Sequence, residues 1–403
     1  MVFVRSADLS AFQTPIVRLQ RIDHYHMKHF FLLTALAFIA ACNAQDASTS
    51  VEEVVVAPPR LLEQVYVSDT SIYARKAAAA FEMLTDSQRV AQMIMTTGGR
   101  LGKSQEEIAS LIKDGVVGGS IYLANELEDH RSQVAASNAV GEQYAPLPLW
   151  FAIDAEPSLM HRRIVGGPPV MPAADMQNDQ DVQVAVKTID SLISDLGYHW
   201  NYAPVLDLGT ENAAIKNRSF GFEAKTVAER SITYVNETQA DGVLACIKHF
   251  PGHGLVEGDS HKGSVFIDGE MKEYGVYEEV LAKADPLSLM VGHITIKNNE
   301  FDTEGLPASL SRRVTHDLVR DKLGYEGIVV TDAINMMAAA SKYGKEAPLM
   351  ASKAGADVIL MPVDERLTMR MILDEMAKDP AYKAQVYRSV DRVLRAKAWL
   401  GLL

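Results

Sequence analysis

The segment Gly242-Val-Leu-Ala-Cys-Ile-Lys-His-Phe-Pro-Gly-His-Gly254 changes character at its midpoint. Its first part, as far as Ile247, is a short apolar run that is typical of a buried strand. From Lys248 onward it carries a lysine, histidines, a proline and glycines, which neither a helix nor a central strand readily accommodates. Asp259-Ser-His261 follows a few residues later. The sequence therefore predicts a rigid strand that delivers ionisable groups into a shaped loop, as in many active sites.

The composition is that of a folded protein with a sizeable core. The chain has 403 residues, of which 48% are hydrophobic and 23% are charged. This length allows two or three domains, or a single α/β barrel of about 250 residues with insertions. The formal net charge of −13 disfavours nucleic acid as a partner, because binding to phosphates requires a basic surface. It does not restrict the substrate, since a basic pocket can lie in an acidic protein.

Past residue 70, short apolar runs alternate with amphipathic segments such as 181–196 and 314–323, which are predicted helices. Eight runs are predicted strands, namely 92–97, 117–123, 149–154, 199–207, 243–249, 287–293, 327–332 and 356–361. Eight strands separated by helices match an α/β fold of the (β/α)₈ TIM-barrel type. A doubly wound open sheet is built from the same units, so periodicity alone leaves both architectures open.

The ends of these runs favour the barrel. Ionisable residues follow the last apolar residue of several different strands, and they are Asp154, Asp207, Lys248, His249, His293 and Asp332. A barrel active site requires this arrangement, because its βα loops meet at one face. Each residue also has a structural reading: Asp207 could begin a loop, and Asp332 could cap the helix that follows it.

The N-terminus predicts the compartment. Residues 1–26 are a predicted upstream extension, and residues 27–41, beginning at Met27, are a predicted signal peptide with an apolar run too short to span a membrane. Ile39-Ala-Ala-Cys42 resembles the lipobox of bacterial lipoproteins, which implies lipidation at Cys42; a plain secretory signal is the alternative. Residues 42–69 are a predicted flexible tether, and residues 70–403 the single catalytic domain. We expect a periplasmic protein whose only link to the membrane is this anchor, with the outer membrane favoured by Asn43.

The mature domain then holds a single cysteine, Cys246, in an apolar run, so it is a predicted buried hydrophobe without a disulfide partner.

Asp259 and His261 are close enough for the carboxylate to orient the imidazole and to stabilise its protonated form. Asp332, from another strand, could be a nucleophile or a base. The histidine spacing around Asp259-Ser-His261 differs from that of common zinc motifs, so we expect no metal, and we expect no cofactor. No G-x-S-x-G elbow surrounds Ser260, which disfavours a serine hydrolase.

Several motifs together resemble glycoside hydrolase family 3, and most closely its β-N-acetylglucosaminidase branch of the NagZ type. The resemblance runs from about residue 76 to the C-terminus. It rests on Lys248-His-Phe-Pro-Gly-His-Gly254, Asp259-Ser-His261, Asn217-Arg-Ser-Phe-Gly221, Gly305-Leu-Pro-Ala-Ser-Leu310 and Gly327-Ile-Val-Val-Thr-Asp332-Ala. It implies a TIM barrel and a retaining mechanism with a covalent glycosyl-enzyme intermediate.

Residue by residue, the resemblance implies that Asp332 is the nucleophile and His261 the acid/base, with Asp259 as its partner. It places Asp154, Arg218, Lys248 and His249 around the sugar in the −1 subsite. We add Arg162 and His293 to this substrate-binding set, although for His293 a hydrogen-bonded wall role is the alternative. The family pattern Asp-x-Glu-Gly-Gly-Arg-Val-x-Arg is altered here. Asp154 and Arg162 keep their places, but Pro157-Ser-Leu replaces the Gly-Gly turn and the first arginine.

The expected function is the hydrolysis of terminal N-acetylglucosamine from peptidoglycan-derived fragments. The β-glucosidase relatives carry a second α/β domain that supplies their acid/base, whereas here the loop with Asp259 and His261 would supply it. A phosphorylase is one alternative, because a histidine acid/base tolerates anionic phosphate better than a carboxylate does. A catalytically weak, lipid-anchored glycan-binding protein is another. We expect a monomer that binds an N-acetylglucosamine-containing glycan.

Overall fold

The computed structural model describes residues 60–209, 211–256, 265–336 and 343–403, which belong to one compact unit. The upstream extension, the predicted signal peptide and Cys42 lie outside the described residues, as do Asp259 and His261. Within the described ranges, every helix is too short or too polar to cross a membrane.

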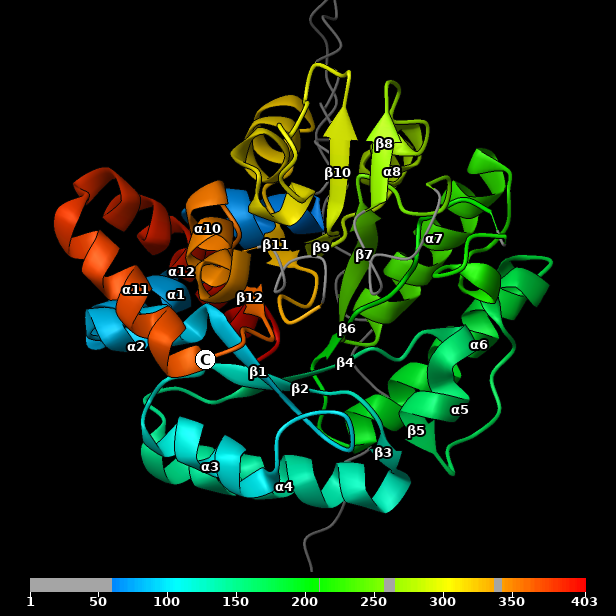
Figure 1. Ribbon diagram of the computed structural model, residues 1–403. Coiled ribbons are helices and arrows are strands. Elements are labelled where there is room, and N and C mark those ends of the chain that lie inside the picture. The colour runs from blue at the N-terminus through cyan, green and yellow to red at the C-terminus, as the bar shows by residue number, and fades with distance from the viewer. Residues whose placement is uncertain (1–59, 210, 257–264, 337–342) are drawn as a thin grey trace, which may run out of the picture. The chain divides into compact units, whose positions relative to one another are not determined.

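All eight predicted strands are present, and they form one parallel sheet in the order β11-β9-β7-β6-β4-β2-β1-β12. Their bounds are β1 (Ile94–Gly98), β2 (Gly119–Tyr122), β4 (Trp150–Ile153), β6 (Trp200–Asn201), β7 (Leu244–Phe250), β9 (Ser288–Val291), β11 (Ile328–Thr331) and β12 (Ile359–Leu360). An isolated parallel bridge between Val330 and Val358 joins the two outer strands of this order, so the barrel is nearly closed. The strands form a ring in Figure 1. The α/β class and the barrel-like sheet are thus confirmed, and an open sheet does not fit.

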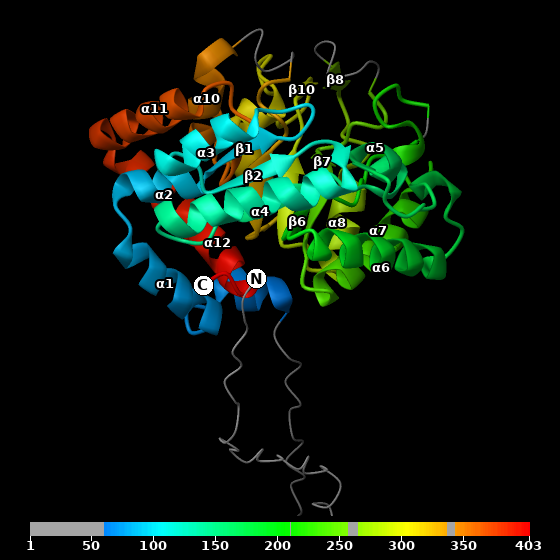
Figure 2. The ribbon, with the colours of Figure 1, turned by 90° about the horizontal axis from the view of Figure 1, so that it is seen from below.

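Helices surround this ring (Figure 1). They are α1 (Ile72–Met83), α2 (Asp86–Gln92), α3 (Gln105–Lys113), α4 (Leu127–Tyr144), α5 (Met160–Arg163), α6 (Asp179–Asp195), α7 (Ala224–Ala240), α8 (Tyr274–Lys283), the π-helix η6 (Arg313–Lys322), α10 (Ala347–Ala354), α11 (Glu365–Lys378) and α12 (Pro380–Trp399). Two short parallel pairs lie outside the barrel, β3 (Asn125–Glu126) with β5 (Ile164–Val165), and β8 (Val265–Asp268) with β10 (Ile294–Lys297). Figure 2 shows β8 and β10 at the end of the barrel opposite to α1 and α12.

Side chains alternate between the inside and the outside of the barrel, because successive residues of a strand point to opposite faces. In β4, Trp150 belongs to the interior cluster whereas Phe151 packs against the surrounding helices. In β7, Cys246 points inward and Ile247 outward. The thiol of Cys246 is fully buried, which confirms the prediction of a buried residue, and burial raises its pKa to about 12.

The end of the barrel nearest α12 is filled by the segment that begins the described chain. The π-helix η1 (Glu63–Val67) places Val65 and Tyr66 in the interior cluster, and the Tyr66 hydroxyl donates to the carbonyl of Leu287 at 3.0 Å. Arg60 forms an ion pair with Asp285 at 2.6 Å. The predicted tether therefore extends too far. From residue 60 onward the chain is part of the barrel, because its apolar side chains close one end of the core.

Candidate active site

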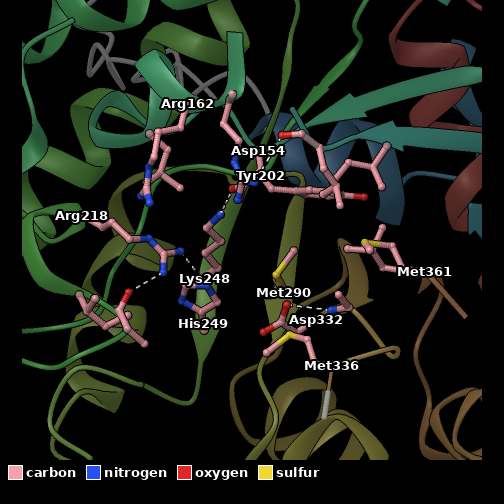
Figure 3. Close-up of a pocket in the computed structure, with 18 of the residues that line it drawn as sticks. Asp154, Arg162, Tyr202, Arg218, Lys248, His249, Met290, Asp332, Met336 and Met361 are labelled. Carbon is pink, nitrogen blue, oxygen red and sulfur yellow. Dashed lines mark hydrogen bonds and ion pairs between the residues drawn. The ribbon is translucent and has the colours of Figure 1, made fainter. Parts of the chain in front are cut away.

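Three charged side chains meet at the open end of the barrel because of strand alternation. Trp150, Cys246 and Val330 point inward, and Asp154, Lys248 and Asp332 keep the same parity at the carboxyl ends of β4, β7 and β11. All three line one cavity of about 480 Å³. Its other polar lining includes Arg162, Arg163, Lys216, Asn217, Arg218, His249 and Asn335. Figure 3 shows Arg162 and Arg218 on one side of this cavity and Asp332 on the other.

A buried network of ion pairs holds one wall of the cavity. The Lys248 ammonium contacts Asp154 Oδ1 and lies 2.6 Å from Glu156 Oε1, and both Lys248 and Glu156 are about 2% exposed. Arg218 donates to both oxygens of Glu156, from Nε and from one terminal nitrogen, each at 2.7 Å. Arg163 contacts the other oxygen of Asp154. Two carboxylates are thus shared among three cations, and this sharing fixes the orientation of every group.

This network also sets the charge of its members. Burial by itself would raise the pKa of Asp154, but Lys248, Arg163 and Arg218 hold that pKa well below its usual range. Burial would lower the pKa of Lys248, but Asp154 and Glu156 raise it above its ordinary value. Both groups are therefore charged at neutral pH. An ionised carboxylate only accepts hydrogen bonds and an ammonium only donates them, so the pair offers complementary contacts to sugar hydroxyls.

His249 is held in one orientation by two neighbours. Its Nδ1 lies 2.6 Å from Asp207 Oδ2, and its Nε2 lies 3.3 Å from a terminal nitrogen of Arg218. Because arginine can only donate, these partners favour the tautomer in which Nδ1 carries the proton and Nε2 accepts. The same Asp207 carboxylate accepts the backbone N–H of His253 at 2.7 Å. Asp207 is thus more than a loop start: it orients an imidazole in the cavity wall.

A second buried carboxylate, Glu273, shapes the loop after β7. One of its oxygens accepts the backbone N–H of Leu208 at 2.6 Å and that of Gly254 at 3.0 Å. The fit around this loop explains its glycines. A Cβ on Gly254 would lie 1.8 Å from the carbonyl oxygen of Leu208, and Gly252 has a φ of 126° with the Glu273 side chain against it. Only glycine is compatible with these positions.

Asp332 lies at the end of β11, where it is partly exposed to the cavity. Its backbone N–H donates to Val291 at 2.9 Å, and its Oδ1 accepts the backbone N–H of Ala333 at 2.8 Å. His293 supports this segment from behind: Nδ1 lies 2.7 Å from the Ser309 hydroxyl, and Nε2 lies 2.9 Å from the carbonyl oxygen of Ala333. His293 is 1% exposed and does not line the cavity. Both ring nitrogens of His293 thus have partners next to Asp332, and its contact with substrate stays a prediction.

Of the other predicted binding residues, Asp154, Arg218, Lys248 and His249 are brought together, whereas Arg162 stands apart. Arg162 lines the cavity but is exposed, and the neighbouring Arg163 makes the contact with Asp154. After Pro157 the chain forms a 3-10 turn (Pro157–Leu159) and then α5, and this local path turns Arg163 back toward Asp154. Counting along the family pattern finds Arg162, so Arg163 was missed. Glu156 was also missed, although it stands in the Asp-Ala-Glu motif.

Arg163 contacts Asp154, which is predicted to bind the sugar, so we expect Arg163 to position that carboxylate. We expect Arg163→Ala to lower kcat/KM for an aryl N-acetylglucosaminide by about 10- to 100-fold, since a hydrogen bond between charged groups is worth about 1.5–3 kcal/mol. Arg163→Lys should restore part of this loss. Arg162→Ala serves as the matched comparison, with a several-fold smaller effect expected. Equal losses in the two alanine variants, measured by steady-state kinetics, would contradict this assignment.

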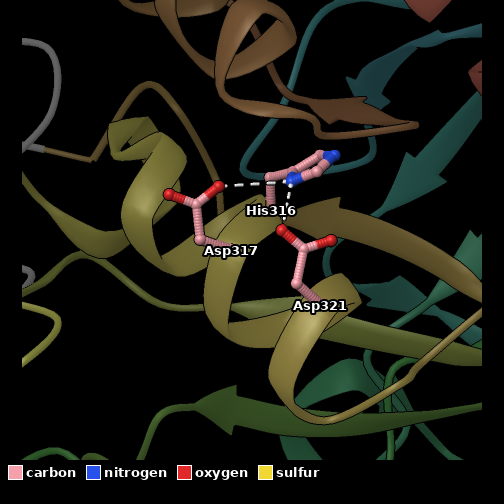
Figure 4. A group of neighbouring side chains, drawn as sticks. All are labelled: His316, Asp317 and Asp321. Carbon is pink, nitrogen blue, oxygen red and sulfur yellow. Dashed lines mark hydrogen bonds and ion pairs between the residues drawn. The ribbon is translucent and has the colours of Figure 1, made fainter.

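One other group of side chains in the described ranges could hold a cation, and it lies on η6 away from the cavity (Figure 4). His316 Nδ1 lies 3.3 Å from Asp317 Oδ1 and 3.4 Å from Asp321 Oδ2. Arg312 lies 3.7 Å from the same Asp317 oxygen, so the acidic charge already has a partner within the chain. The group is partly exposed, and exposed acidic groups commonly hold no ion. We assign it no function.

Comparison with known proteins agrees with the geometry. Residues 85–396 match the family described as "Glycosyl hydrolase family 3 N terminal domain". The chain belongs to glycoside hydrolase family 3. Among family 3 relatives, "Beta-hexosaminidase LpqI" of Mycobacterium tuberculosis is 28% identical over 345 residues, which cover 82% of this chain and 86% of the relative. "Beta-hexosaminidase A" of Pseudoalteromonas piscicida is 26% identical over 330 residues, and the match covers 73% of this chain.

Solved family 3 structures share the fold. A β-N-acetylglucosaminidase from Paenibacillus sp. str. FPU-7 superimposes with a TM-score of 0.71 at 30% identity, covering 79% of this chain and 63% of that one. "Beta-glucoside phosphorylase BglX bound to 2FGlc" has a TM-score of 0.75 at 20% identity, covering 85% of this chain and 64% of that one, and shows the fold alone. The chain spans 55% of the length of the Pseudoalteromonas relative. The activity of those longer proteins is therefore not transferred to this chain by similarity.

Proposed function

We propose that this family 3 chain is a retaining β-N-acetylglucosaminidase that releases terminal, non-reducing N-acetylglucosamine from peptidoglycan-derived fragments. The observation that carries the proposal is the placement of Asp332 and the Asp154–Lys248 pair around one cavity, from three different strands. The names of its relatives, beta-hexosaminidases and β-N-acetylglucosaminidases, support the choice of sugar.

In the proposed reaction, the Asp332 carboxylate attacks the anomeric carbon and displaces the leaving group. His261, assisted by Asp259, donates a proton to the departing glycosidic oxygen, so that the leaving group departs as a neutral alcohol. Water then attacks the glycosyl-Asp332 ester while the same histidine accepts a proton from it. The two displacements together retain the β configuration, and the enzyme returns to its starting state.

The buried network supports sugar binding in this scheme. Asp154 is held ionised by Lys248 and Arg163, and its remaining lone pairs can accept from two hydroxyls. Lys248, Arg218 and His249 line the same wall, and their partners are fixed before a ligand arrives. Such preorganisation lowers the cost of orienting the sugar for attack.

The test is turnover of p-nitrophenyl N-acetyl-β-D-glucosaminide, with and without inorganic phosphate. The hydrolase proposal expects free N-acetylglucosamine in both conditions. Release of the sugar 1-phosphate would identify a phosphorylase, which the proposed histidine acid/base would also permit. Binding without turnover would identify a glycan-binding protein. Mass spectrometry of the products from purified wall fragments then tests the natural substrate, and an absence of N-acetylglucosamine among them would contradict it.

We also propose that the protein is held at the periplasmic face of a bacterial membrane, favouring the outer membrane, through a lipid on Cys42. The support is the lipobox-like Ile39-Ala-Ala-Cys42 after an apolar run. Cells that express the full chain should incorporate labelled palmitate into it, and Cys42→Ser should abolish the label and move the protein to the soluble fraction. Retention of label in the Cys42→Ser variant would contradict the proposed anchor.

A further inference from the structure

Two buried carboxyl groups lie beside each other behind the cavity wall, where the segment after β6 crosses the loop after β7. Asp207 is fully buried, and Glu273, the residue before α8, is 2% exposed. Asp207 accepts the backbone N–H of His253, and Glu273 accepts that of the next residue, Gly254. Glu273 also accepts the N–H of Leu208, the residue after Asp207. The two acids therefore hold the same crossing of the chain, and the charge of each affects the other.

Of the two acids, Asp207 is the one favoured to ionise, because a side chain donates to it. Its Oδ2 lies 2.6 Å from His249 Nδ1, and although burial by itself would raise the pKa of Asp207, His249 and His253 lower that pKa. Glu273 makes no ion pair with the residues that the structure describes, and its hydrogen bonds there come from backbone N–H groups. Burial and the charge of Asp207 raise the pKa of Glu273 from 4.5 to about 8. Two adjacent buried negative charges repel strongly, so one of the two acids retains its proton.

The contacts of the Glu273 carboxyl group are uneven, and the difference matches a protonated acid. Oε1 accepts two backbone N–H groups, that of Leu208 at 2.6 Å and that of Gly254 at 3.0 Å. Oε2 accepts only that of Leu255, at the longer distance of 3.3 Å. A carbonyl oxygen is a good acceptor, whereas a hydroxyl oxygen uses its proton to donate. The geometry therefore favours a proton on Oε2.

The titratable and charged groups that face these two acids come from each neighbouring element. They are His249 and His253 on and after β7, Arg218 on the 3-10 turn η4 (Lys216–Arg218), and Tyr277 on α8. Arg218 is paired with Glu156, and burial raises the pKa of Tyr277 well above its ordinary value, so that phenol stays neutral. None of these groups brings a free positive charge to Glu273, and a proton is the remaining way to neutralise it.

We propose that Glu273 is a positioning residue that acts as a neutral acid: its proton lets Asp207 stay ionised and hold His249 toward the sugar. His249 lines the cavity near Arg218 (Figure 3). The inference rests on the proposed function, in which His249 contacts the terminal sugar. Loss of the proton would place a second negative charge at the crossing, and repulsion would separate the segments that carry Leu208 and Gly254. His249 would then lose its fixed orientation, and the sugar would bind more weakly as the pH rises.

The variant Glu273→Gln tests this role, because its amide has the shape of the protonated acid but no proton to lose. Calorimetry of the full chain with N-acetylglucosamine gives the affinity at about pH 6.5 and about pH 9.5, on either side of the Glu273 transition. We expect the wild-type affinity to fall about tenfold over this range, the equivalent of one lost hydrogen bond, and that of Glu273→Gln to change by about twofold or less.

Glu278→Gln, at an exposed position on α8, is the matched control and should follow the wild type. Equal falls in affinity in the wild type and in Glu273→Gln would overturn the proposal, because the loss would then come from another group.

Thermal unfolding needs no sugar, and so separates failure of this role from failure of the proposed function. Because the pKa of Glu273 is raised in the folded protein, its contribution to stability is complete below about pH 4.5 and is lost as the pH rises to about 8. Glu273→Gln lacks this loss. We expect the two proteins to have the same Tm near about pH 5, and the variant to melt about 5 °C higher near about pH 9.

The two measurements together identify what fails. A difference in Tm that grows with pH, in a protein that binds no N-acetylglucosamine, would reject the proposed function and keep the assignment of Glu273 as a neutral acid. A difference in Tm that stays constant with pH would show that Glu273 is ionised throughout, and would overturn the proposal whatever the activity.

Discussion

The Asp332→Ala variant is expected to lose roughly 10⁴-fold or more in kcat/KM for p-nitrophenyl N-acetyl-β-D-glucosaminide, since removal of a nucleophile leaves only binding and orientation. Asp332 ends β11 with the inward parity of Val330, and it faces the cavity opposite Arg218 (Figure 3). Its backbone N–H donates to Val291, so the truncation should leave the chain path intact. Initial rates, together with thermal melting to confirm folding, provide the measurement.

The shape of the site can be preserved in a second variant, Asp332→Asn, which should be nearly as inactive as the alanine variant. Azide added to Asp332→Ala should restore part of the rate and yield the α-glycosyl azide, because a small anion can occupy the space of the carboxylate. Asp374→Ala, which truncates an exposed carboxylate on α11, is the matched control. Activity of Asp332→Ala within tenfold of the wild type would exclude Asp332 as the nucleophile.

The second large effect is expected at His261, and its size should depend on the leaving group. For a disaccharide whose leaving alcohol needs a proton, His261→Ala should lower kcat by about 10²- to 10⁴-fold, the usual contribution of general acid catalysis. For the p-nitrophenyl glycoside, which leaves as a stable phenolate, the loss in the first step should be far smaller. The limb of the pH profile that reports the protonated acid should disappear as well.

The control for this experiment is His316→Ala, which removes a partly exposed histidine on η6 that does not line the cavity. It should leave the ratio of the two rates unchanged. Equal losses on the disaccharide and on the aryl glycoside in His261→Ala would refute the assignment of His261 as the acid, and would direct attention to a role in sugar binding.

The barrel could be predicted because hydrophobic burial is periodic. Each strand is a short apolar run, and several are followed by ionisable residues where the strands reach the open end. The same periodicity explains why Asp154, Lys248 and Asp332 meet, since they share the parity of the interior residues before them. The strand bounds were less predictable: the run 199–207 contains the short strand Trp200–Asn201, and its later residues are joined to β7 by an isolated bridge between Val205 and Lys248.

The network behind the sugar site was less accessible to sequence reasoning. Glu156 and Glu273 are buried carboxylates whose hydrogen-bond partners lie far away in the sequence. No local sequence pattern predicts such contacts. Arg162 and Arg163 are neighbours in sequence, so only the path of α5 decides which one contacts Asp154. The segment from residue 60 was assigned to the tether because its composition is mixed, yet Val65 and Tyr66 fill the barrel.

The segment around η1 closes one end of the barrel, and this restricts how substrate and products move in the proposed reaction. Val65 and Tyr66 are buried in the interior cluster, and the buried Lys397 ammonium donates to the carbonyl of Pro148 at 2.8 Å, so side chains of the described residues fill this end of the barrel. Substrate then reaches the proposed sugar site only from the opposite, open end of the barrel, as far as the described residues show. In the proposed reaction, the leaving alcohol departs through the open end before water reaches the ester on Asp332. The released sugar leaves through the same end. We expect release of the sugar through that end, as well as bond breaking, to contribute to the turnover rate.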